Sequence, residues 1–124
     1  MSPTPAEATL GRLAETVEVV DAWLDAAVAP GYRDEPLAQD WARVAKASEE
    51  VGEAVDALIR WTGQNPRKGV CGTLDELLDE LADVATAGLY AIQHFTKDSG
   101  ETMERLMATA ERHRQRVLDA QRPV

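Results

Sequence analysis

Apolar residues recur along most of this chain at steps of three and four positions, which is the spacing of one face of an α-helix. A first stripe runs from Leu10 to Val28 and ends before a Pro-Gly pair. A second stripe predicts a helix over about residues 36–62. Asp34 is its candidate N-cap, a proline follows in the first turn, and Gly63 stops it.

The third stripe is the most apolar and predicts a helix over about residues 73–96. Thr73 and Glu76 have the spacing of a capping box at its start. A fourth, more polar helix is expected from Glu101 to about Gln121. No stretch alternates with a period of two, so no strand is predicted. The pattern predicts an all-α fold, a four-helix bundle in which the third helix is central and the fourth is peripheral or packs on a second subunit.

Length and composition favour one globular domain over residues 1–124, with the helices at about 36–62 and 73–96 as its core. Hydrophobic residues make up 44% and charged residues 28%, which is typical of a folded rather than a disordered chain. The first residues lack a signal-peptide pattern, and no apolar run is long enough to span a bilayer. We therefore expect a soluble, cytoplasmic protein without a membrane partner.

The net charge of the chain limits the classes of ligand that it is expected to bind. The chain has 22 acidic and 13 basic residues, a formal net charge of -9. This balance argues against binding a nucleic acid polymer, because phosphate contacts need clustered Lys and Arg. A nucleotide would have to be bound through a metal ion. Cys71 is the single cysteine, which excludes an internal disulfide and a zinc-thiolate cluster.

One acidic pattern occurs twice, 30 positions apart, as Glu49-Glu50-Val51-Gly52-Glu53 and as Asp79-Glu80-Leu81-Ala82-Asp83. In each copy two carboxylates three positions apart share a helix face. With Val51 and Leu81 at the centres of their apolar stripes, Glu50 and Glu80 fall on one flank, and Glu53 and Asp83 lie further round on the same side. If the two helices pack antiparallel, four carboxylates converge.

Such a concentration of negative charge is costly unless a cation neutralises it, so the pattern predicts a divalent metal site. Oxygen-only donors favour Mg²⁺ or Mn²⁺, and the lack of His at the i+3 positions counts against a di-iron centre. A single Glu-x-x-Glu is usually just part of a solvated helix face. Two matched copies, in register with their stripes, favour the site.

The motif Glu49-Glu50-x-x-Glu53, then 26 residues, then Glu80-x-x-Asp83 resembles the EExxE…ExxD signature of the MazG-like all-α nucleoside triphosphate pyrophosphohydrolases. The resemblance spans roughly residues 36 to 96, and the loop after Gly63 is similar to one in short members.

It implies the all-α fold of that family and the hydrolysis of a (d)NTP to the monophosphate and pyrophosphate, as house-cleaning of the nucleotide pool. It further implies Mg²⁺ as the cofactor, with Mn²⁺ as a substitute, and a homodimer or a dimer of dimers. The implied metal ligands are Glu50, Glu53, Glu80 and Asp83. Glu49, together with Glu50 and Glu53, belongs to the implied catalytic set, as a further ligand or as the base that orients water.

Candidate substrate contacts each have a plainer alternative. Lys46 either touches a phosphate or forms an ion pair within its helix, and the ion pair is favoured. Arg67 and Lys68 either clamp phosphates from their loop or are solvated. Trp61 either stacks on a base or packs in the core or an interface. Arg116 in the fourth helix is a candidate phosphate contact, among basic residues that are otherwise solvated.

Three further aromatic residues and one histidine complete the set. Tyr90 and His94 continue the Asp83 side of their helix. His94 either meets the substrate or is a hydrogen-bonded or dipole-satisfying residue near the helix end, and the second is favoured. Trp23 and Trp41 are interpreted as packing residues.

A second class of function competes with the enzyme. The chain would then be a catalytically weak MazG-like module that binds nucleotides or a protein partner and acts as a regulator. Release of pyrophosphate in the presence of Mg²⁺ distinguishes the two, and a purely structural bundle would show no Mg²⁺-dependent stabilisation.

Overall fold

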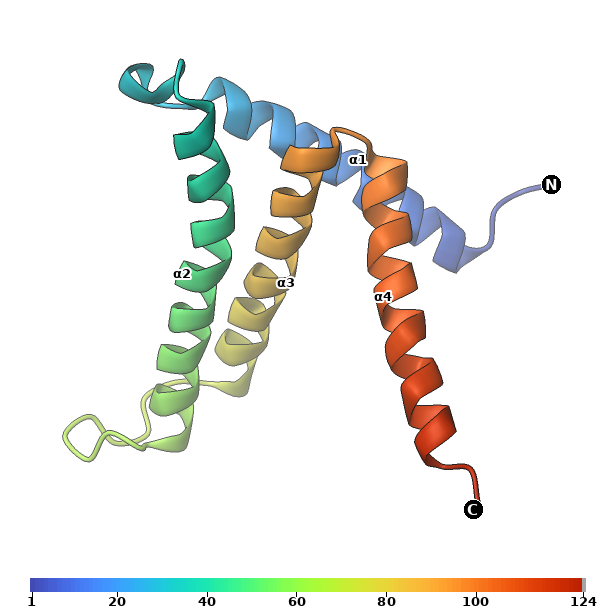
Figure 1. The fold of residues 1–124 in the computed structure, drawn as a ribbon. Coiled ribbons are helices and arrows are strands. Elements are labelled where there is room, and N and C mark those ends of the chain that lie inside the picture. Colours follow the sequence, from blue (N-terminus) through green and yellow to red (C-terminus); the bar gives the residue numbers. More distant parts are fainter. Residues whose placement is uncertain (124) are drawn as a thin grey trace.

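The computed structural model describes residues 1–123, and its regular secondary structure in that range consists of helices joined by loops (Figure 1). The elements in chain order are the α-helix α1 (Pro5–Ala26), a short 3-10 helix η1 (Pro30–Tyr32), α2 (Pro36–Thr62), α3 (Leu74–Thr96) and α4 (Ser99–Ala120). The prediction of an all-α fold with four helices and no strand is confirmed for these residues. None of their helices combines the length and apolarity needed to cross a membrane.

The ends of the central helices show why they begin and stop where they do. Thr73 Oγ1 accepts a hydrogen bond from the backbone N–H of Glu76 at 3.1 Å, and Glu76 Oε2 accepts from the N–H of Thr73 at 3.4 Å, so the capping box is confirmed. Gly63 ends α2 with φ 71°, as predicted. A Cβ on Gly63 would lie 2.8 Å from Val70 Cγ2, so a side chain does not fit there.

Two predicted helix starts are wrong by one or two residues. The N-cap of α2 is Glu35, and Asp34 lies one position outside. The reason is that Pro36 occupies the first helical position, which makes the residue before it the cap. Helix α4 begins at Ser99, two residues before the predicted start, because Asp98 accepts a hydrogen bond from the backbone N–H of Glu101 at 3.0 Å.

Helices α2 and α3 form a long antiparallel pair, α1 crosses one end of the pair, and α4 diverges from it (Figure 1). The third helix is central, since it packs against each of the other three helices. The fourth is peripheral, since it contacts α1 and α3 only, and nearly all side chains from residue 104 to 120 are exposed. Within the described residues the backbones of α1 and α2 do not come close, so side chains must bridge them.

Ion pairs provide that bridge. The Arg43 guanidinium of α2 lies 3.0 Å from Asp21 Oδ1 and 2.9 Å from Asp25 Oδ1, both on α1, and it donates to the carbonyl oxygen of Tyr90 on α3 at 3.3 Å. Lys97 Nζ, at the end of α3, donates to the same two aspartates at 2.8 and 2.6 Å. This network of Asp21, Asp25, Arg43 and Lys97 holds α1 across the α2–α3 pair.

Two hydrogen bonds complete the framework. His94 Nε2 lies 2.7 Å from Asp40 Oδ1, so the interpretation of His94 as a hydrogen-bonded residue is confirmed. The buried Thr102 hydroxyl donates to Gln93 Oε1 at 2.8 Å, which attaches the start of α4 to α3.

The chain buries few apolar side chains. Within the described residues the buried hydrophobic ones are Val17, Ala54, Ala57, Ala87 and Leu89. Trp23 and Trp41 are exposed, so their interpretation as packing residues is wrong for the single chain.

The apolar stripes are also turned relative to the predicted orientation. Val51 and Leu81, the predicted stripe centres, are each 48% exposed, whereas Glu50 is 8% exposed. On each helix the apolar arc is therefore wider than the area in contact with the partner helix. The centre of that contact lies one residue, or about 100° round the helix axis, from the centre of the apolar arc.

Candidate metal and nucleotide site

Three carboxylates meet where α2 and α3 pack together. Glu50 from α2 and Glu80 and Asp83 from α3 each offer a ligand oxygen, and these oxygens lie within 4.8 Å of one another. Glu50 Oε2 and Glu80 Oε2 are buried and have no hydrogen-bond partner within the described residues. The nearest opposing charge is Lys46, whose Nζ lies 2.8 Å from Glu50 Oε1. One ammonium group thus faces three carboxylates.

Small residues bring these carboxylates together. Ala54 and Ala57, which follow Glu50 by one and two helical turns, are buried against α3. Ala87, one turn after Asp83, is also buried. Because methyl side chains let the two backbones approach closely, carboxylates in the same rows converge at the helix contact.

The ionisation of the cluster reflects this crowding. The hydrogen bond from Lys46 lowers the pKa of Glu50, against the opposing effect of burial. The pKa of Glu53 is raised, first by the negative charge of Glu50, then by its hydrogen bond with Glu50, by burial and by the charge of Glu80. Hydrogen bonds with Glu50 and Glu49 raise the pKa of Lys46. Glu53 is therefore electrostatically part of the cluster, although its side chain is exposed.

The cluster suits a hard divalent cation. Its donors are carboxylate oxygens, the ligands that Mg²⁺ and Mn²⁺ prefer, and two of those oxygens are buried without a hydrogen atom to accept. A second group of three, Asp21, Asp25 and His94, lies equally close together. There Arg43 and Lys97 already neutralise the carboxylates, so that group is a structural ion-pair network.

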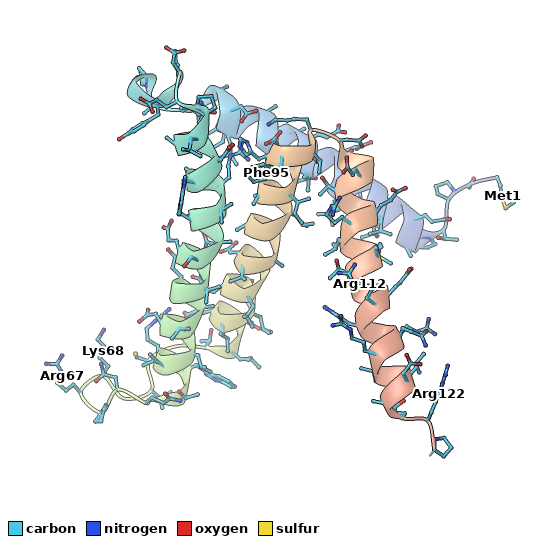
Figure 2. All side chains as sticks on the ribbon, viewed as in Figure 1. Met1, Arg67, Lys68, Phe95, Arg112 and Arg122 are labelled. Atoms are coloured by element: carbon cyan, nitrogen blue, oxygen red, sulfur yellow. The ribbon has the colours of Figure 1, made fainter. Side chains whose placement is uncertain are left out.

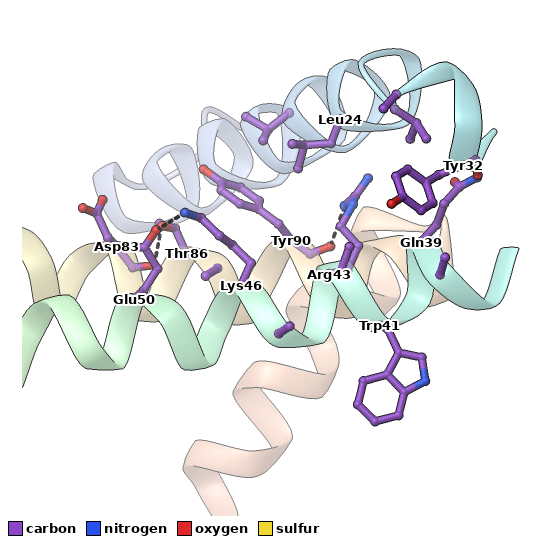
Figure 3. Close-up of a pocket in the computed structure, with 17 residues that line it drawn as sticks. Leu24, Tyr32, Gln39, Trp41, Arg43, Lys46, Glu50, Asp83, Thr86 and Tyr90 are labelled. Atoms are coloured by element: carbon purple, nitrogen blue, oxygen red, sulfur yellow. Dashed lines mark hydrogen bonds and ion pairs between the residues drawn. The ribbon is translucent and has the colours of Figure 1, made fainter. Parts of the chain in front are cut away.

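A cleft of about 840 Å³ opens beside the carboxylates, between α1, α2 and α3 (Figure 3). Glu50 and Asp83 lie at one end and Tyr32 at the other, with Lys46 and Tyr90 between them. The wall formed by α1 and the segment just after it is aliphatic and includes Val20, Leu24 and Val28. The cleft exists because long side chains of the ion-pair network, rather than close backbone packing, join α1 to α2.

Most polar groups in the cleft already have partners. Arg43 is held by the aspartates of α1. Gln39 Nε2 donates to the carbonyl oxygens of Tyr32 and Arg33 at 3.2 and 3.1 Å, which leaves its Oε1 as an acceptor. The cleft is thus a largely apolar, electroneutral space that opens onto a strongly acidic end.

Some predicted site residues lie at this place. Lys46 lines the cleft and forms the favoured intrahelical ion pairs, with Glu50 at 2.8 Å and with Glu49 at 3.2 Å. Glu49 itself is exposed and turned toward Lys46 rather than toward Glu80 and Asp83.

The other predicted substrate contacts lie elsewhere in the chain. Trp61 follows Glu50 by eleven positions, about 16 Å along the helix axis. Arg67 and Lys68 are at the outer tip of the loop beyond the ends of α2 and α3 (Figure 2). Arg116 is exposed on the diverging part of α4. In the described chain none of these four lines the cleft.

The structure adds residues to the site. Tyr90 follows Asp83 by seven positions, two helical turns, so it lies on the same face as expected. Tyr32 and Gln39 were not predicted, and no local pattern marks them. They reach the cleft only because η1 and the start of α2 fold back toward α1, which depends on the distant pairing of Arg43 with Asp21.

Comparison with protein-family models, with curated proteins and with solved structures finds no match for this chain. The class of protein is therefore defined by the fold and the site alone. The chain is an all-helical protein in which carboxylates from two antiparallel helices meet at the end of an apolar cleft.

Proposed function

We propose that this protein is a Mg²⁺-dependent nucleoside triphosphate pyrophosphohydrolase that converts a (d)NTP to the monophosphate and pyrophosphate, in a house-cleaning role in the cytoplasm. One observation carries the proposal. The buried Glu50 carboxylate, with one oxygen lacking a partner, faces Glu80 and Asp83 at the mouth of the cleft. A divalent cation would neutralise such a group of carboxylates, and the adjoining space would accommodate an organic group.

The residues supply binding and proton transfer. Glu50, Glu80 and Asp83 would hold the metal, with Glu53 as a fourth carboxylate. Mn²⁺ would substitute for Mg²⁺. When bound, the divalent ion supplies positive charge that stabilises the phosphoryl transition state. Water adds to the α-phosphorus, the bond from that phosphorus to the bridging oxygen breaks, and pyrophosphate leaves. Glu49, beside the ligand set in the sequence, would be a further ligand or the base that takes the proton of the water.

The cleft supports the assignment of a nucleotide as the substrate. Phosphates bound at the acidic end would direct the nucleoside toward Tyr90 and Tyr32, along the aliphatic wall of α1. The Lys46 ammonium lies where the phosphates would enter, so it would offset their charge. The volume of about 840 Å³ lies in the range of small-molecule pockets.

A second candidate function is a catalytically weak regulatory module that binds nucleotides or a protein partner. The placement of the basic residues favours it. Arg67, Lys68 and Arg116 lie away from the cleft within one chain, and Lys46 is already paired with two glutamates. A site with so few unpaired cations could bind a metal–nucleotide complex without accelerating its hydrolysis.

The test is release of pyrophosphate from a panel of canonical and modified (d)NTPs with Mg²⁺. We expect turnover by the wild type and a loss of about 100-fold or more in Glu50→Gln and in Asp83→Asn, because each removes a ligand charge. The matched control is Glu104→Gln, which neutralises an exposed carboxylate on α4 and should keep full activity.

A folded wild type that releases no pyrophosphate with Mg²⁺ or Mn²⁺ would overturn the enzyme proposal. Calorimetric titration with the same nucleotides then tests the regulatory module. Binding that requires the metal supports that module, and absence of binding excludes it for the panel.

A further inference from the structure

The end of the cleft farthest from the carboxylates is formed by Tyr32 and Gln39 (Figure 3). Gln39 precedes Glu50 by eleven positions on α2, which separates the two residues by about 16 Å along the helix axis. A nucleoside triphosphate whose phosphates lie at Glu50 would extend its base toward this end. A base bound there would contact Gln39.

The side-chain amide of Gln39 is held in one orientation by the backbone. Its Nε2 donates to the carbonyl oxygens of Tyr32 and Arg33 at 3.2 and 3.1 Å, so both amide hydrogens are engaged. An amide turned by 180° would place Oε1 against the same two carbonyl oxygens. Because acceptors repel one another, only the observed orientation is stable.

The Oε1 atom is the free end of this amide. No donor within the described residues reaches it, and it is not among the buried atoms that lack a partner, so solvent or a ligand in the cleft can contact it. A glutamine side chain normally both donates and accepts hydrogen bonds. Toward a ligand in this cleft, Gln39 acts as an acceptor only.

The neighbouring side chains leave Gln39 to decide which polar group is bound. Ala38 and Ala42 are apolar, and the Arg43 guanidinium is held by Asp21 and Asp25. The Tyr32 hydroxyl rotates and can donate or accept, so it accommodates either kind of group. Gln39 Oε1 is thus an acceptor of fixed direction at the end of the cleft where the base would lie.

Nucleobases differ at the position that such an acceptor contacts. Cytosine and adenine carry an exocyclic amino group, which donates, whereas uracil, thymine, guanine and hypoxanthine carry an oxygen at the corresponding position, which accepts. An oxygen placed against Oε1 would leave two acceptors facing each other without a proton between them. The two-bond contact of a glutamine with adenine also needs a hydrogen on Nε2, and both of these are engaged.

We propose that Gln39 selects substrates whose base carries this amino group, a 4-aminopyrimidine or a 6-aminopurine. Gln39 Oε1 accepts a hydrogen bond from the amino group, and the Tyr32 ring offers an apolar face beside it. This inference rests on the proposed function, because it takes a nucleotide as the ligand of the cleft.

The test measures binding rather than turnover. Calorimetric titration with Mg²⁺ uses α,β-methylene analogues, in which carbon replaces the oxygen between the α and β phosphates, so the proposed bond cannot be cleaved. The analogues of dCTP and dUTP form one matched pair, and those of dATP and dITP form another. We expect the amino member of each pair that binds to have a Kd at least about tenfold lower than the oxo member.

The outcomes separate this inference from the proposed function. Equal Kd values within the pairs would overturn the inference and leave a nucleotide-binding cleft. Absence of binding by all four analogues would overturn both the inference and the nucleotide substrate. Amino preference in a chain that releases no pyrophosphate would support the inference and contradict only the hydrolysis.

A matched pair of variants assigns the preference to its residue. Gln39→Met keeps the length of the side chain without an oxygen, so the preference should fall below about threefold. Gln115→Met makes the same change on α4, where the amide donates to Asp119 at 2.9 Å, and should keep the preference. A tenfold preference that persists in folded Gln39→Met would overturn the inference.

A measurement on the wild type covers the case in which Gln39→Met does not fold. The side-chain amide of Gln39 gives its own ¹⁵N signal in magnetic resonance spectra. At equal saturation the dCTP analogue should shift that signal more than the dUTP analogue, because only the amino group donates to Oε1. Equal shifts by the two analogues would overturn the inference.

Discussion

At the scale of residues, Asp21 and Asp25 occupy one face of α1 a turn apart and share both basic partners, yet their environments differ. The Asp21 side chain is 7% exposed and that of Asp25 is 40% exposed. We expect Asp21→Asn to lower the free energy of unfolding by about 3 kcal/mol, because Arg43 loses its buried counter-charge. The matched change Asp25→Asn should cost less than about 1 kcal/mol, because water screens that pair. Urea unfolding checks both, and equal losses would contradict this interpretation.

The pH dependence of Asp25 follows from the direction of its shift. Burial raises its pKa, but the hydrogen bond and charge of Lys97 and the charges of Arg43 and His94 outweigh that effect and lower it. A lowered pKa means that Asp25 stabilises the fold above its usual value of 3.8, and that this contribution disappears as the pH falls through the folded pKa. The difference in stability between wild type and Asp25→Asn should therefore be present at pH 7 and shrink progressively as the pH falls below 3.8. A constant difference would point to lost packing instead.

Glu53 shows the opposite sign. Because Glu50 and Glu80 raise its pKa, against the weaker opposing charge of Lys46, the folded protein is penalised at pH values above 4.5 and reaches the full penalty above the raised pKa. Glu53→Gln should raise the melting temperature at pH 7.5 without metal, and the gain should fall toward zero near pH 4.5.

Addition of Mg²⁺ gives the complementary result. It should raise the melting temperature of wild type more than that of Glu53→Gln, because binding to the folded state stabilises it. Glu104→Gln, away from the cluster, should show neither effect. Stabilisation by Mg²⁺ that is equal in all three proteins would contradict a role for Glu53 at the metal.

The acidic residues were predictable from sequence, whereas the residues that shape the cleft were not. Glu50 lies in the acidic pattern of α2, and Glu80 and Asp83 lie in the matching pattern of α3. The spacing within each pattern indicates which face of its helix carries the carboxylates, without knowledge of the structure. Arg43 and Asp21 lie 22 positions apart in different helices. No periodicity specifies their pairing, because it depends on how α1 crosses the helix pair.

At the scale of elements, α4 is attached to the rest of the chain through its first turn. Thr102 is fully buried, and its hydroxyl donates to Gln93 Oε1. Thr102→Val keeps the volume but leaves that buried acceptor without a donor, which should cost about 1–2 kcal/mol in urea unfolding. The control Thr109→Val, further along α4, should change the stability by less than about 0.5 kcal/mol. Similar losses in both would mean that α4 is held along its length.

The helices themselves were largely predictable, since capping chemistry and apolar spacing are local. The capping box of Thr73 and the stop at Gly63 confirm that logic. The orientation of α2 and α3 was not predictable. Their apolar arcs are broad enough to allow several rotations, and small residues such as Ala54 and Ala87 decide which part faces the partner helix.

At the scale of the whole molecule, large apolar side chains of α2 and α3 remain exposed and α4 diverges from the helix pair. Sequence pattern reveals the width of an apolar arc, but the same arc can serve a core or an interface. Only the three-dimensional arrangement distinguishes the two, by showing that Val51 and Leu81 are left uncovered.

If folding and self-association are coupled, stability must depend on concentration. Each tenfold dilution removes about 1.4 kcal/mol from the stability of a dimer, which corresponds to a fall of about 3–6 °C in melting temperature for a unit of this size. Calorimetry of the wild type over a hundredfold range of concentration should show this shift. Leu81→Glu, which adds a carboxylate to the exposed apolar face of α3, should melt at a lower temperature than the wild type at each concentration, because it weakens the contact. A melting temperature independent of concentration would mean that α1–α4 fold without a partner, and that the exposed apolar side chains of α2 and α3 do not stabilise the chain through self-association.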